Sequence, residues 1–397
     1  MEVNFRIPFA PRSNQLIHRL QQGMKKKVIL VWDHFGPIHL DRLKAVNASL
    51  PQTHKMQAIE IGGKSTEYDW WNEQGDNDYK TLFPKLSLEK VSTLKLLIAL
   101  ISSTNPFQRS AFFLCHMERP AIFLFACWLR MTNNRVFAMG CSKFDDKPRS
   151  VFKEMLKSIF FVPYRGAIGS GQRGKEYFNF LGVPKGNIVG EYNTLSVKRI
   201  QRLSGSPPAP DGLPFEERNF LCIARLIPKK NLSFLIHSYA EFLKLHKEGS
   251  PRKLVLVGDG PERKNLTEKI ETLSLQEHVV FKGVLQSRDV AKELSKAFTL
   301  ILPSYEEQFG NVVIEAQAMG LPTIISSNCG AADSLVQSGV NGFVFEANNS
   351  KGLAYFMSCI SNDKTLWMKL AYEAQKSSHL GDSARFAEGV LHLATRK

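Results

Sequence analysis

FTLILPSYEEQFGNVVIEAQAMG, residues 298–320, carries the clearest fold signal in this chain. The apolar run 298–303 predicts a buried strand, and residues 312–320 predict a helix closed by glycine. The loop between them therefore opens a helix. Because the first N–H groups of a helix are unpaired and carry partial positive charge, an anion such as a nucleotide diphosphate can bind there.

Two glutamates, Glu307 and Glu315, flank this predicted anion site. Carboxylates accept charge-assisted hydrogen bonds from hydroxyl groups, so one can meet the hydroxyls of a sugar while the other meets those of a ribose. Two solvated glutamates on a loop and a helix face would show the same spacing. The spacing alone favours that interpretation, and other motifs are needed to decide.

Length and composition restrict the class of protein. The chain has 397 residues and 43% hydrophobic residues, which predicts a globular protein of two domains. Its formal net charge of +15 and pI near 9.5 predict attraction to nucleic acid, anionic lipid or phosphorylated small molecules. Charge alone does not choose among these partners.

Cysteine usage and apolar runs suggest a compartment. The six cysteines form no Cys-x-x-Cys pair, which favours free thiols in a reducing cytosol. The start of the chain lacks a secretory signal pattern, and the apolar runs 94–101 and 121–129 are too short to span a bilayer. We expect a cytoplasmic protein, soluble or peripheral at the inner face of the membrane.

Alternating strand-like and helix-like segments predict an α/β fold with two Rossmann-like domains facing across a cleft. A run rich in proline, glycine and serine separates them. We expect an N-terminal extension at residues 1–23, an acceptor-binding domain at 24–200, a linker at 201–216, a nucleotide-sugar-binding domain at 217–375, and a C-terminal helix at 376–397 that packs back on the first domain.

Apolar runs in the second half mark individual elements. Strands are expected at residues 219–224, 253–257, 279–281 and 321–326, and a helix at residues 232–244.

Arg225 and Lys230 lie in the segment ARLIPKKN, residues 224–231, which ends a predicted strand and begins a predicted helix. Guanidinium and ammonium groups at this point can neutralise a departing diphosphate. A solvated basic turn would have the same composition.

Two glycine-rich segments imitate other nucleotide sites. The turn at residues 258–263 lacks the third glycine of a dinucleotide fingerprint, which favours plain packing. Residues 62–66 end like a phosphate-binding loop, but the first glycine of that motif should stand at Ala58. Neither segment predicts the site that it imitates.

Residues 218–345 resemble the retaining GT-B glycosyltransferases of family 4, the glycosyl transferases group 1. The resemblance is carried by several motifs in the same order: Arg225 with Lys230, Gly258-Asp-Gly-Pro261, Phe281-Lys-Gly283, Glu307 with Glu315, Phe309-Gly310, Gly320-Leu-Pro322 and Gly339-Val-Asn-Gly-Phe343.

The resemblance implies a role for each matching residue. Arg225 and Lys230 would bind the diphosphate, Glu307 the donor sugar and Glu315 the ribose. Backbone amides of the turn would reach sugar or phosphate, and the remaining donor-binding candidates are Phe309, Gly310, Asn311, Gly258 and Gly283. The resemblance implies no cofactor and no metal, and the sequence shows no histidine or cysteine cluster with ligand spacing.

The first half matches the family less well. In WDHFGPIH, residues 32–39, Gly36 is expected near the phosphates. Many members carry an active-site histidine in the region that reads FAMGCS at residues 137–142, and this chain has none there. His116 or His39 could serve the acceptor side instead, although each is more often a structural histidine. An aromatic loop at residues 65–71 could stack on a sugar, with core packing the simpler interpretation.

Residues 147–166 predict a basic amphipathic helix. Apolar side chains at Val151, Phe152, Met155, Leu156, Ile159 and Phe160 recur at helical spacing among Lys147, Arg149, Lys153, Lys157 and Arg165. Such a helix can lie on an anionic membrane. Alternatively, the apolar stripe packs inward while the lysines stay solvated, which is the arrangement that we expect.

Together these motifs predict a retaining, metal-independent glycosyltransferase. It would move a hexose from a nucleoside-diphosphate sugar, UDP in preference to GDP, to a hydroxyl acceptor such as a lipid-linked saccharide of surface polysaccharide or glycolipid assembly. Two alternatives stay open: a small soluble acceptor, and a catalytically silent GT-B subunit that binds a partner. A glycosidase fits less well because it needs two carboxylates flanking the bond and no diphosphate cradle. Nucleic acid is not the expected partner.

Overall fold

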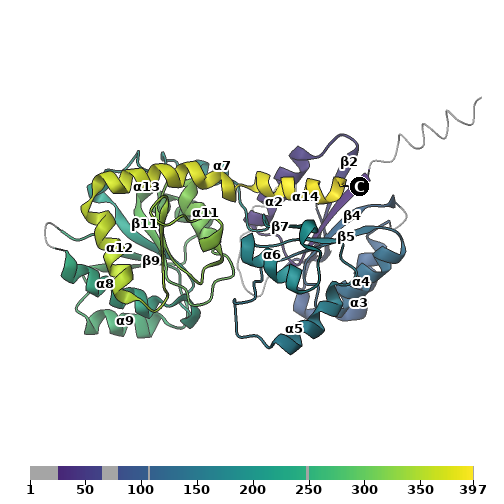
Figure 1. The fold of residues 1–397 in the computed structure, drawn as a ribbon, viewed down its shortest axis with the longest axis horizontal. Helices are drawn as coiled ribbons and strands as arrows, with labels where there is room; N and C mark the ends of the chain where they lie inside the picture. Colours follow the sequence, from purple (N-terminus) through teal and green to yellow (C-terminus); the bar gives the residue numbers. More distant parts are fainter. Residues whose placement is uncertain (1–25, 65–78, 106–107, 247–249, 397) are drawn as a thin grey trace, which may run out of the picture.

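The computed structural model describes residues 26–64, 79–105, 108–246 and 250–396, which form two parallel β-sheets covered by helices (Figure 1). The extension expected at residues 1–23 and the aromatic loop expected at 65–71 lie outside the described residues. The predicted α/β fold with two Rossmann-like domains is confirmed.

The first sheet has seven strands in the order β3-β2-β1-β4-β5-β6-β7, and every neighbouring pair is parallel. Its strands are β1 (Lys26–Trp32), β2 (His54–Gly62), β3 (Tyr79–Phe83), β4 (Ala111–Leu114), β5 (Arg135–Met139), β6 (Gly166–Ile168) and β7 (Ile188–Val189). The helices of this part are α2 (Pro37–Ser49), α3 (Thr93–Ser102), α4 (Pro120–Met131), α5 (Val151–Lys157) with the 3₁₀ turn η3 (Ser158–Phe161), and α6 (Gly171–Phe180).

The second sheet has six parallel strands in the order β10-β9-β8-β11-β12-β13. Its strands are β8 (Asn219–Ile223), β9 (Leu254–Val257), β10 (Val279–Gly283), β11 (Ala297–Leu302), β12 (Thr323–Ser326) and β13 (Gly342–Phe345). The helices are α7 (Val197–Ser204), α8 (Leu232–Leu245), α9 (Arg263–Thr272), α10 (Ser287–Lys296), α11 (Asn311–Ala318), α12 (Ser350–Asn362), α13 (Lys364–Ser377) and α14 (Ser383–Thr395).

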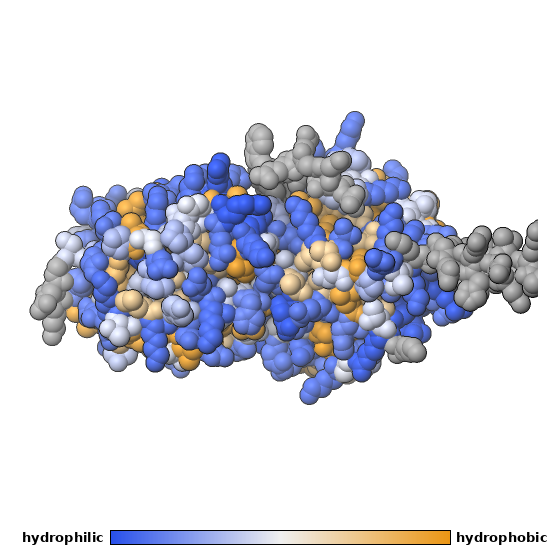
Figure 2. Space-filling model, turned by 90° about the horizontal axis from the view of Figure 1, so that it is seen from above, coloured by the Kyte–Doolittle hydropathy of each residue, from blue (hydrophilic) through white to orange (hydrophobic). Residues whose placement is uncertain are grey.

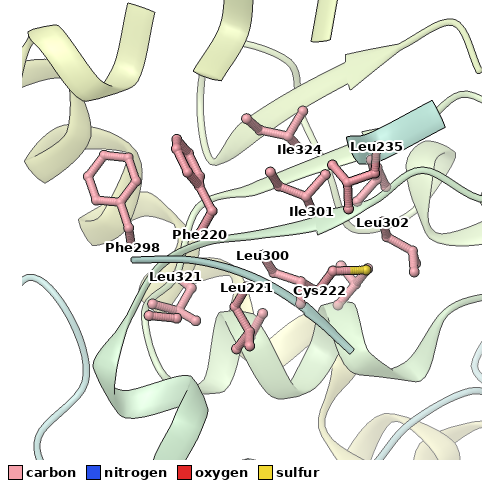
Figure 3. Packing of buried hydrophobic residues seen from close by; sticks show 14 of the residues in the cluster. Phe220, Leu221, Cys222, Leu235, Phe298, Leu300, Ile301, Leu302, Leu321 and Ile324 are labelled. Carbon is pink, nitrogen blue, oxygen red and sulfur yellow. The ribbon is translucent and has the colours of Figure 1, made fainter. Parts of the chain in front are cut away.

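Continuous apolar runs explain the central strands. All six residues of β11 are buried, because helices cover both faces of a parallel sheet. Figure 3 shows side chains of β8, β11 and β12, among them Leu221, Ile301 and Ile324, packed together in the core of the second domain.

The end of the chain returns to the first domain. Helices α13 and α14 run along one side of the molecule, and α14 packs on α2 (Figure 1). Leu195 accepts a hydrogen bond from Ser383 N and donates one to Gly381 O, at 2.9 and 3.0 Å. Seen from this side, the surface is mostly hydrophilic with apolar residues interspersed (Figure 2). The backbone hydrogen bonds of Leu195 with Gly381 and Ser383 fix the point where the chain crosses back from the second domain to the first.

The strand order of each sheet reverses once, between β1 and β4 in the first and between β8 and β11 in the second. Ligands of such sheets bind outside the carboxyl ends of the strands at this reversal. Contacts between the domains join loops at those ends: Cys141 Sγ donates to Gln308 Oε1 at 2.9 Å, and Asn193 Nδ2 donates to Asn311 Oδ1 at 2.8 Å. The carboxyl ends of the two sheets therefore face each other.

The expectation that the apolar stripe of residues 147–166 packs inward is wrong. Phe152 and Met155 on α5 are 70% and 60% exposed, and Val162 after η3 is 80% exposed. The face that packs inward is polar: Glu154 is buried, and Arg149 donates to it at 2.9 Å and to Tyr177 Oη at 2.8 Å. This ion-paired network occupies the inner face of α5, so its apolar side chains point to solvent. Of the six apolar residues of the predicted stripe, Phe160 alone packs against the core.

Candidate active site

The strand reversal of the second sheet lies between two loops, residues 224–231 after β8 and residues 303–310 after β11. Backbone and side-chain hydrogen bonds join them. Tyr305 N donates to Lys229 O at 2.9 Å, and Asn231 Nδ2 donates to Pro303 O at 3.2 Å. The structure therefore brings the loop of Arg225 and Lys230 against the loop of Glu307.

Lys230 and Glu307 form an ion pair between Nζ and Oε2. Their side chains are 14% and 13% exposed, and Ser304 Oγ donates to the same Glu307 oxygen at 3.4 Å. Little water reaches this pair, so its charges interact more strongly than on the open surface. Arg225, on the same loop as Lys230, has an exposed side chain. One strand reversal thus presents a carboxylate beside two cationic residues.

Gly310 shapes the turn that starts α11. Its φ of +94° is a left-handed conformation, and a Cβ there would stand 2.9 Å from Leu302 Cδ2 and 3.0 Å from Cys329 Sγ. The preceding Phe309 is buried, and its carbonyl accepts from Ala331 N at 2.9 Å. These contacts hold the start of α11, with Asn311 as its first residue, next to Glu307.

Glu315 lies within α11 and is half-buried. Burial raises the pKa of its carboxyl to about 7, the Arg199 guanidinium opposes the rise, and Asp41 adds to it. Arg199 Nε donates to Asp41 Oδ1 at 2.8 Å, which links α7 to α2 of the first domain. Glu315 therefore stands near the connection between the domains.

Gly258 and Gly283 contact each other beneath the Arg225 loop. Gly258 N donates to Gly283 O at 2.8 Å, and a Cβ on Gly258 would stand 2.0 Å from Ala224 O. The glycine at 258 is thus required by the close approach of the segment that leads to Arg225.

The strand reversal of the first sheet carries a second ion pair. His116 Nε2, after β4, lies 3.5 Å from Asp33 Oδ2, after β1. Burial alone would raise the pKa of Asp33, but the hydrogen bond and charge of His116 outweigh it and lower that pKa to about 2. Burial likewise opposes the effect of Asp33 on His116, whose pKa is raised. Asp33 is ionised at neutral pH, and His116 is the more basic for it.

Gly36 and His39 belong to the start of α2 in the same region. Gly36 is the N-cap of α2, and its N–H donates to His39 Nδ1 at 3.2 Å. Burial and then the charge of Arg42 lower the pKa of His39 to about 3, so its ring is neutral. His116, in contrast, is one-third exposed and has a left-handed φ of +56°. Of the two histidines, His116 has the geometry to meet a ligand.

Sequence reasoning missed the residues that join the domains around the site. Gln308, next to Glu307, accepts from Cys141 in the region where the family's histidine was sought. Arg173 at the start of α6 pairs with Asp333 of the second domain and donates to Ser327 O at 2.9 Å. Cys141 and Arg173 follow strands of the first sheet, and that position was the available signal.

Two further features concern metal binding and membrane crossing. Within the described ranges, no three histidine, cysteine, aspartate or glutamate side chains gather to hold a metal ion. None of the described helices has the length and hydropathy to cross a bilayer.

Comparison with known proteins gives a family match for the second half of the chain and a fold for nearly all of it. Residues 209–377 match the family described as "Glycosyl transferases group 1". The poly(glycerol-phosphate) alpha-glucosyltransferase of Bacillus subtilis is 32% identical over 169 residues, 43% of this chain and 24% of the relative. The matched part spans less than half the length of the next curated relatives as well, at 38% and 42%.

Two solved structures cover nearly the whole chain. Sucrose-phosphate synthase from Thermosynechococcus elongatus has a TM-score of 0.69 at 17% identity and covers 91% of this chain and 96% of its own. Anabaena HepE in complex with UDP has a TM-score of 0.68 at 18% identity and covers 93% and 99%. At such identities the likeness concerns the fold, and the fold is GT-B.

Proposed function

Because residues 209–377 match the glycosyl transferases group 1 family, we propose that this chain is a retaining glycosyltransferase that moves a hexose from a UDP-sugar to a hydroxyl acceptor. The observation that carries the proposal is the Lys230–Glu307 ion pair at the strand reversal of the second sheet. The pair joins the Lys230 ammonium, which can bind phosphate, to the Glu307 carboxylate, which can accept hydrogen bonds from sugar hydroxyls. UDP is preferred as the nucleotide because structures of a protein with the same fold contain UDP and UDP-glucose.

In the proposed reaction the bond between the anomeric carbon and the diphosphate breaks. Lys230, Arg225 and the amides at the start of α11 stabilise the departing diphosphate, and preorganised donors of this kind contribute roughly 10²–10³ in rate each. Glu307 accepts from hexose hydroxyls and Glu315 from the ribose. The acceptor oxygen bonds the anomeric carbon from the same face, and its proton passes to a diphosphate oxygen. These cations supply the positive charge, so the reaction uses no metal or cofactor.

The acceptor side of the proposal rests on the first strand reversal. Asp33 and His116 form an ion pair at this reversal, and in the proposal the hydroxyl acceptor approaches them from the first domain. His116 is a positioning residue in this account, because the acceptor proton leaves with the diphosphate. Gly36 would approach the donor phosphates from the same side.

We propose further that the acceptor is a lipid-linked saccharide and that α5 with η3 docks on an anionic bilayer. Apolar side chains of this segment are exposed, including Phe152, Met155 and Val162. Lys147 and Lys153, also exposed, supply the complementary charge. A monomeric protein rarely leaves so many large apolar side chains in water on one short segment.

Incubation with UDP-hexoses tests the proposed activity. A transferase slowly releases UDP even without its acceptor, and Lys230→Gln should abolish the release while thermal unfolding stays cooperative. Binding of UDP-hexose without any release, with or without added acceptors, would instead indicate a catalytically silent subunit. Release by the wild type and the variant at equal rates would reject the site.

A further inference from the structure

A cavity of about 400 Å³ lies at the amino ends of strands in the first sheet. The candidate active site lies at the other end of these strands, where their carboxyl ends meet. Residues that begin β1, β2, β4 and β5 line the cavity, together with the end of α14, which reaches this end of the sheet in Figure 1. Its size lies within the roughly 300–1,000 Å³ of small-molecule sites. No part of the proposed reaction uses it.

The lining of this cavity, here called the basic cavity, is strongly positive. Its cationic residues are Lys26, Lys27, Arg109, Arg135, Arg165 and Arg396, and His54 joins them. No aspartate or glutamate lines it, and in the described parts of the chain none of these side chains pairs with a carboxylate. The positive charge is thus left without a counter-charge from the described protein.

Two of the lining arginines donate hydrogen bonds to backbone carbonyls. Arg135 donates to the carbonyls of Leu393 and Ala394 at the end of α14, and Arg396 donates to Gly186 O at 2.8 Å. These bonds fix both guanidinium groups in place without neutralising them. Burial and then repulsion by Arg165 lower the pKa of Arg135, which is the expected effect of uncompensated positive charge.

Ser110 adds a neutral hydrogen-bonding group. This residue lines the cavity, is 2% exposed, and its Oγ makes no hydrogen bond within the described residues. Buried hydroxyls in proteins nearly always have a partner, because an unsatisfied one loses its hydration without compensation. The hydroxyl is shielded from solvent, so an anion in the cavity would accept from it only after a local rearrangement of the wall.

The second domain provides an internal comparison. A smaller cavity of about 200 Å³ reaches the amino ends of β8 and β11, and its charged lining residues are Glu217, Lys282, Glu293 and Lys296. In that cavity the positive charges of the two lysines are balanced by two glutamates, and Lys282 Nζ lies 3.7 Å from Glu293 Oε1. A basic cavity is therefore not a general consequence of the fold.

We propose that the basic cavity binds a phosphate-bearing anion, held by Arg109 and Arg165. Guanidinium groups match phosphate oxygens in geometry and stay charged at any physiological pH. Such a phosphate can belong to a soluble molecule or to a lipid headgroup. Arg165, which lines the cavity, follows the exposed Val162 by three residues in the sequence.

Calorimetric titration of the full chain with inorganic pyrophosphate tests the proposal. The Arg109→Gln/Arg165→Gln variant should bind at the basic cavity at least roughly tenfold more weakly, since charge-assisted hydrogen bonds to two guanidinium groups are lost. The matched control is Lys282→Gln/Lys296→Gln, which removes two positive charges from the lining of the cavity in the second domain. It should bind as the wild type does.

To distinguish binding at the basic cavity from binding at the proposed donor site, every titration is also run in a Lys230→Gln background. There, binding that survives and is lost on adding the two arginine substitutions belongs to the basic cavity. If the arginine variant binds pyrophosphate like the control in this background, or if the wild type binds none beyond the donor site, the proposal is overturned. If the double variant does not fold, Arg165→Gln alone, with its exposed side chain, should still weaken binding.

Vesicles identify the source of the phosphate. Phosphatidylcholine vesicles with and without phosphatidylglycerol are compared with the soluble pyrophosphate. Weaker binding of the arginine variant to the anionic vesicles as well as to pyrophosphate assigns a lipid headgroup, and an effect on pyrophosphate alone assigns a soluble ligand. An effect confined to RNA oligonucleotides would refute the proposal.

Discussion

Lys230 Nζ contacts Glu307 Oε2 across the strand reversal of the second sheet. The first sheet has the same strand order around its own reversal, and there His116 contacts Asp33. Each domain thus places one ion pair where sheets of this kind bind ligands. In the second domain a diphosphate would take Lys230 and a hexose would take Glu307, so donor binding replaces the pair with two new partnerships.

Replacing Glu307 by Gln tests the sugar contact. We expect kcat to fall by roughly 10²–10³, because a charge-assisted acceptor aimed at the reacting sugar is lost. UDP release and thermal unfolding are measured together, and unfolding should remain cooperative. Glu306→Gln is the matched control, since this neighbouring carboxylate makes no ion pair within the described residues, and its activity should stay close to that of the wild type. Equal losses in both variants would argue against the assignment.

Gly310→Ala tests the turn that starts α11. Its left-handed φ costs an L-residue roughly 1–2 kcal/mol, and the clash of Cβ with Leu302 and Cys329 adds roughly 1–3 kcal/mol. Gly339→Ala is the control, because its φ is +79° but a Cβ there would meet nothing within 4 Å. Urea unfolding should show the larger loss for Gly310→Ala. A similar loss at both positions would show that the turn is not tightly packed.

The pair of His116 and Asp33 predicts a pH dependence of stability. Because the folded pKa of His116 is raised above the ordinary histidine value of 6.5, the stability that the pair contributes is fully present below pH 6.5 and is lost as pH rises through the folded pKa. His116→Asn, which tolerates the left-handed backbone, should flatten this decline. The free energy of unfolding is measured from pH 5 to 9 in both proteins. Identical curves would show that the ion pair of His116 and Asp33 does not contribute to stability.

Phe152→Ser/Met155→Ser tests the docking of α5 on membrane. Binding to vesicles that contain phosphatidylglycerol should weaken by roughly tenfold or more, since each large apolar side chain contributes roughly 1.5–3 kcal/mol when buried. Met368→Ser/Tyr372→Ser on α13, also exposed, is the control and should bind like the wild type. Unchanged binding of the α5 variant would show that this surface does not meet the bilayer.

Patterns in the second half predicted its elements closely because its strands are continuous apolar runs that lie buried in the sheet. Residues 232–244 predicted the helix observed as α8 (Leu232–Leu245), and residues 253–257 predicted β9 (Leu254–Val257). The loops that follow such strands must gather at one edge, so Arg225, Lys230 and Glu307 could be expected together from their order alone.

Other features depend on contacts between residues far apart in the chain. Helical periodicity shows that α5 has two faces, but the inward face was decided by Arg149, Glu154 and Tyr177, which meet only in the folded domain. The contact of Cys141 with Gln308 spans both domains and has no local signature. His39 and His116 likewise look equivalent in sequence, and they differ because His116 pairs with Asp33 in the folded domain while burial keeps His39 neutral.

A crystal structure of the chain with UDP-glucose tests the central claim most directly. We predict the diphosphate within hydrogen-bonding distance of Lys230 and Arg225, with a hexose hydroxyl donating to Glu307 and Lys230 no longer paired with it. A nucleotide bound away from the strand reversal of the second sheet, or a Lys230–Glu307 pair left intact beside an occupied site, would contradict the account.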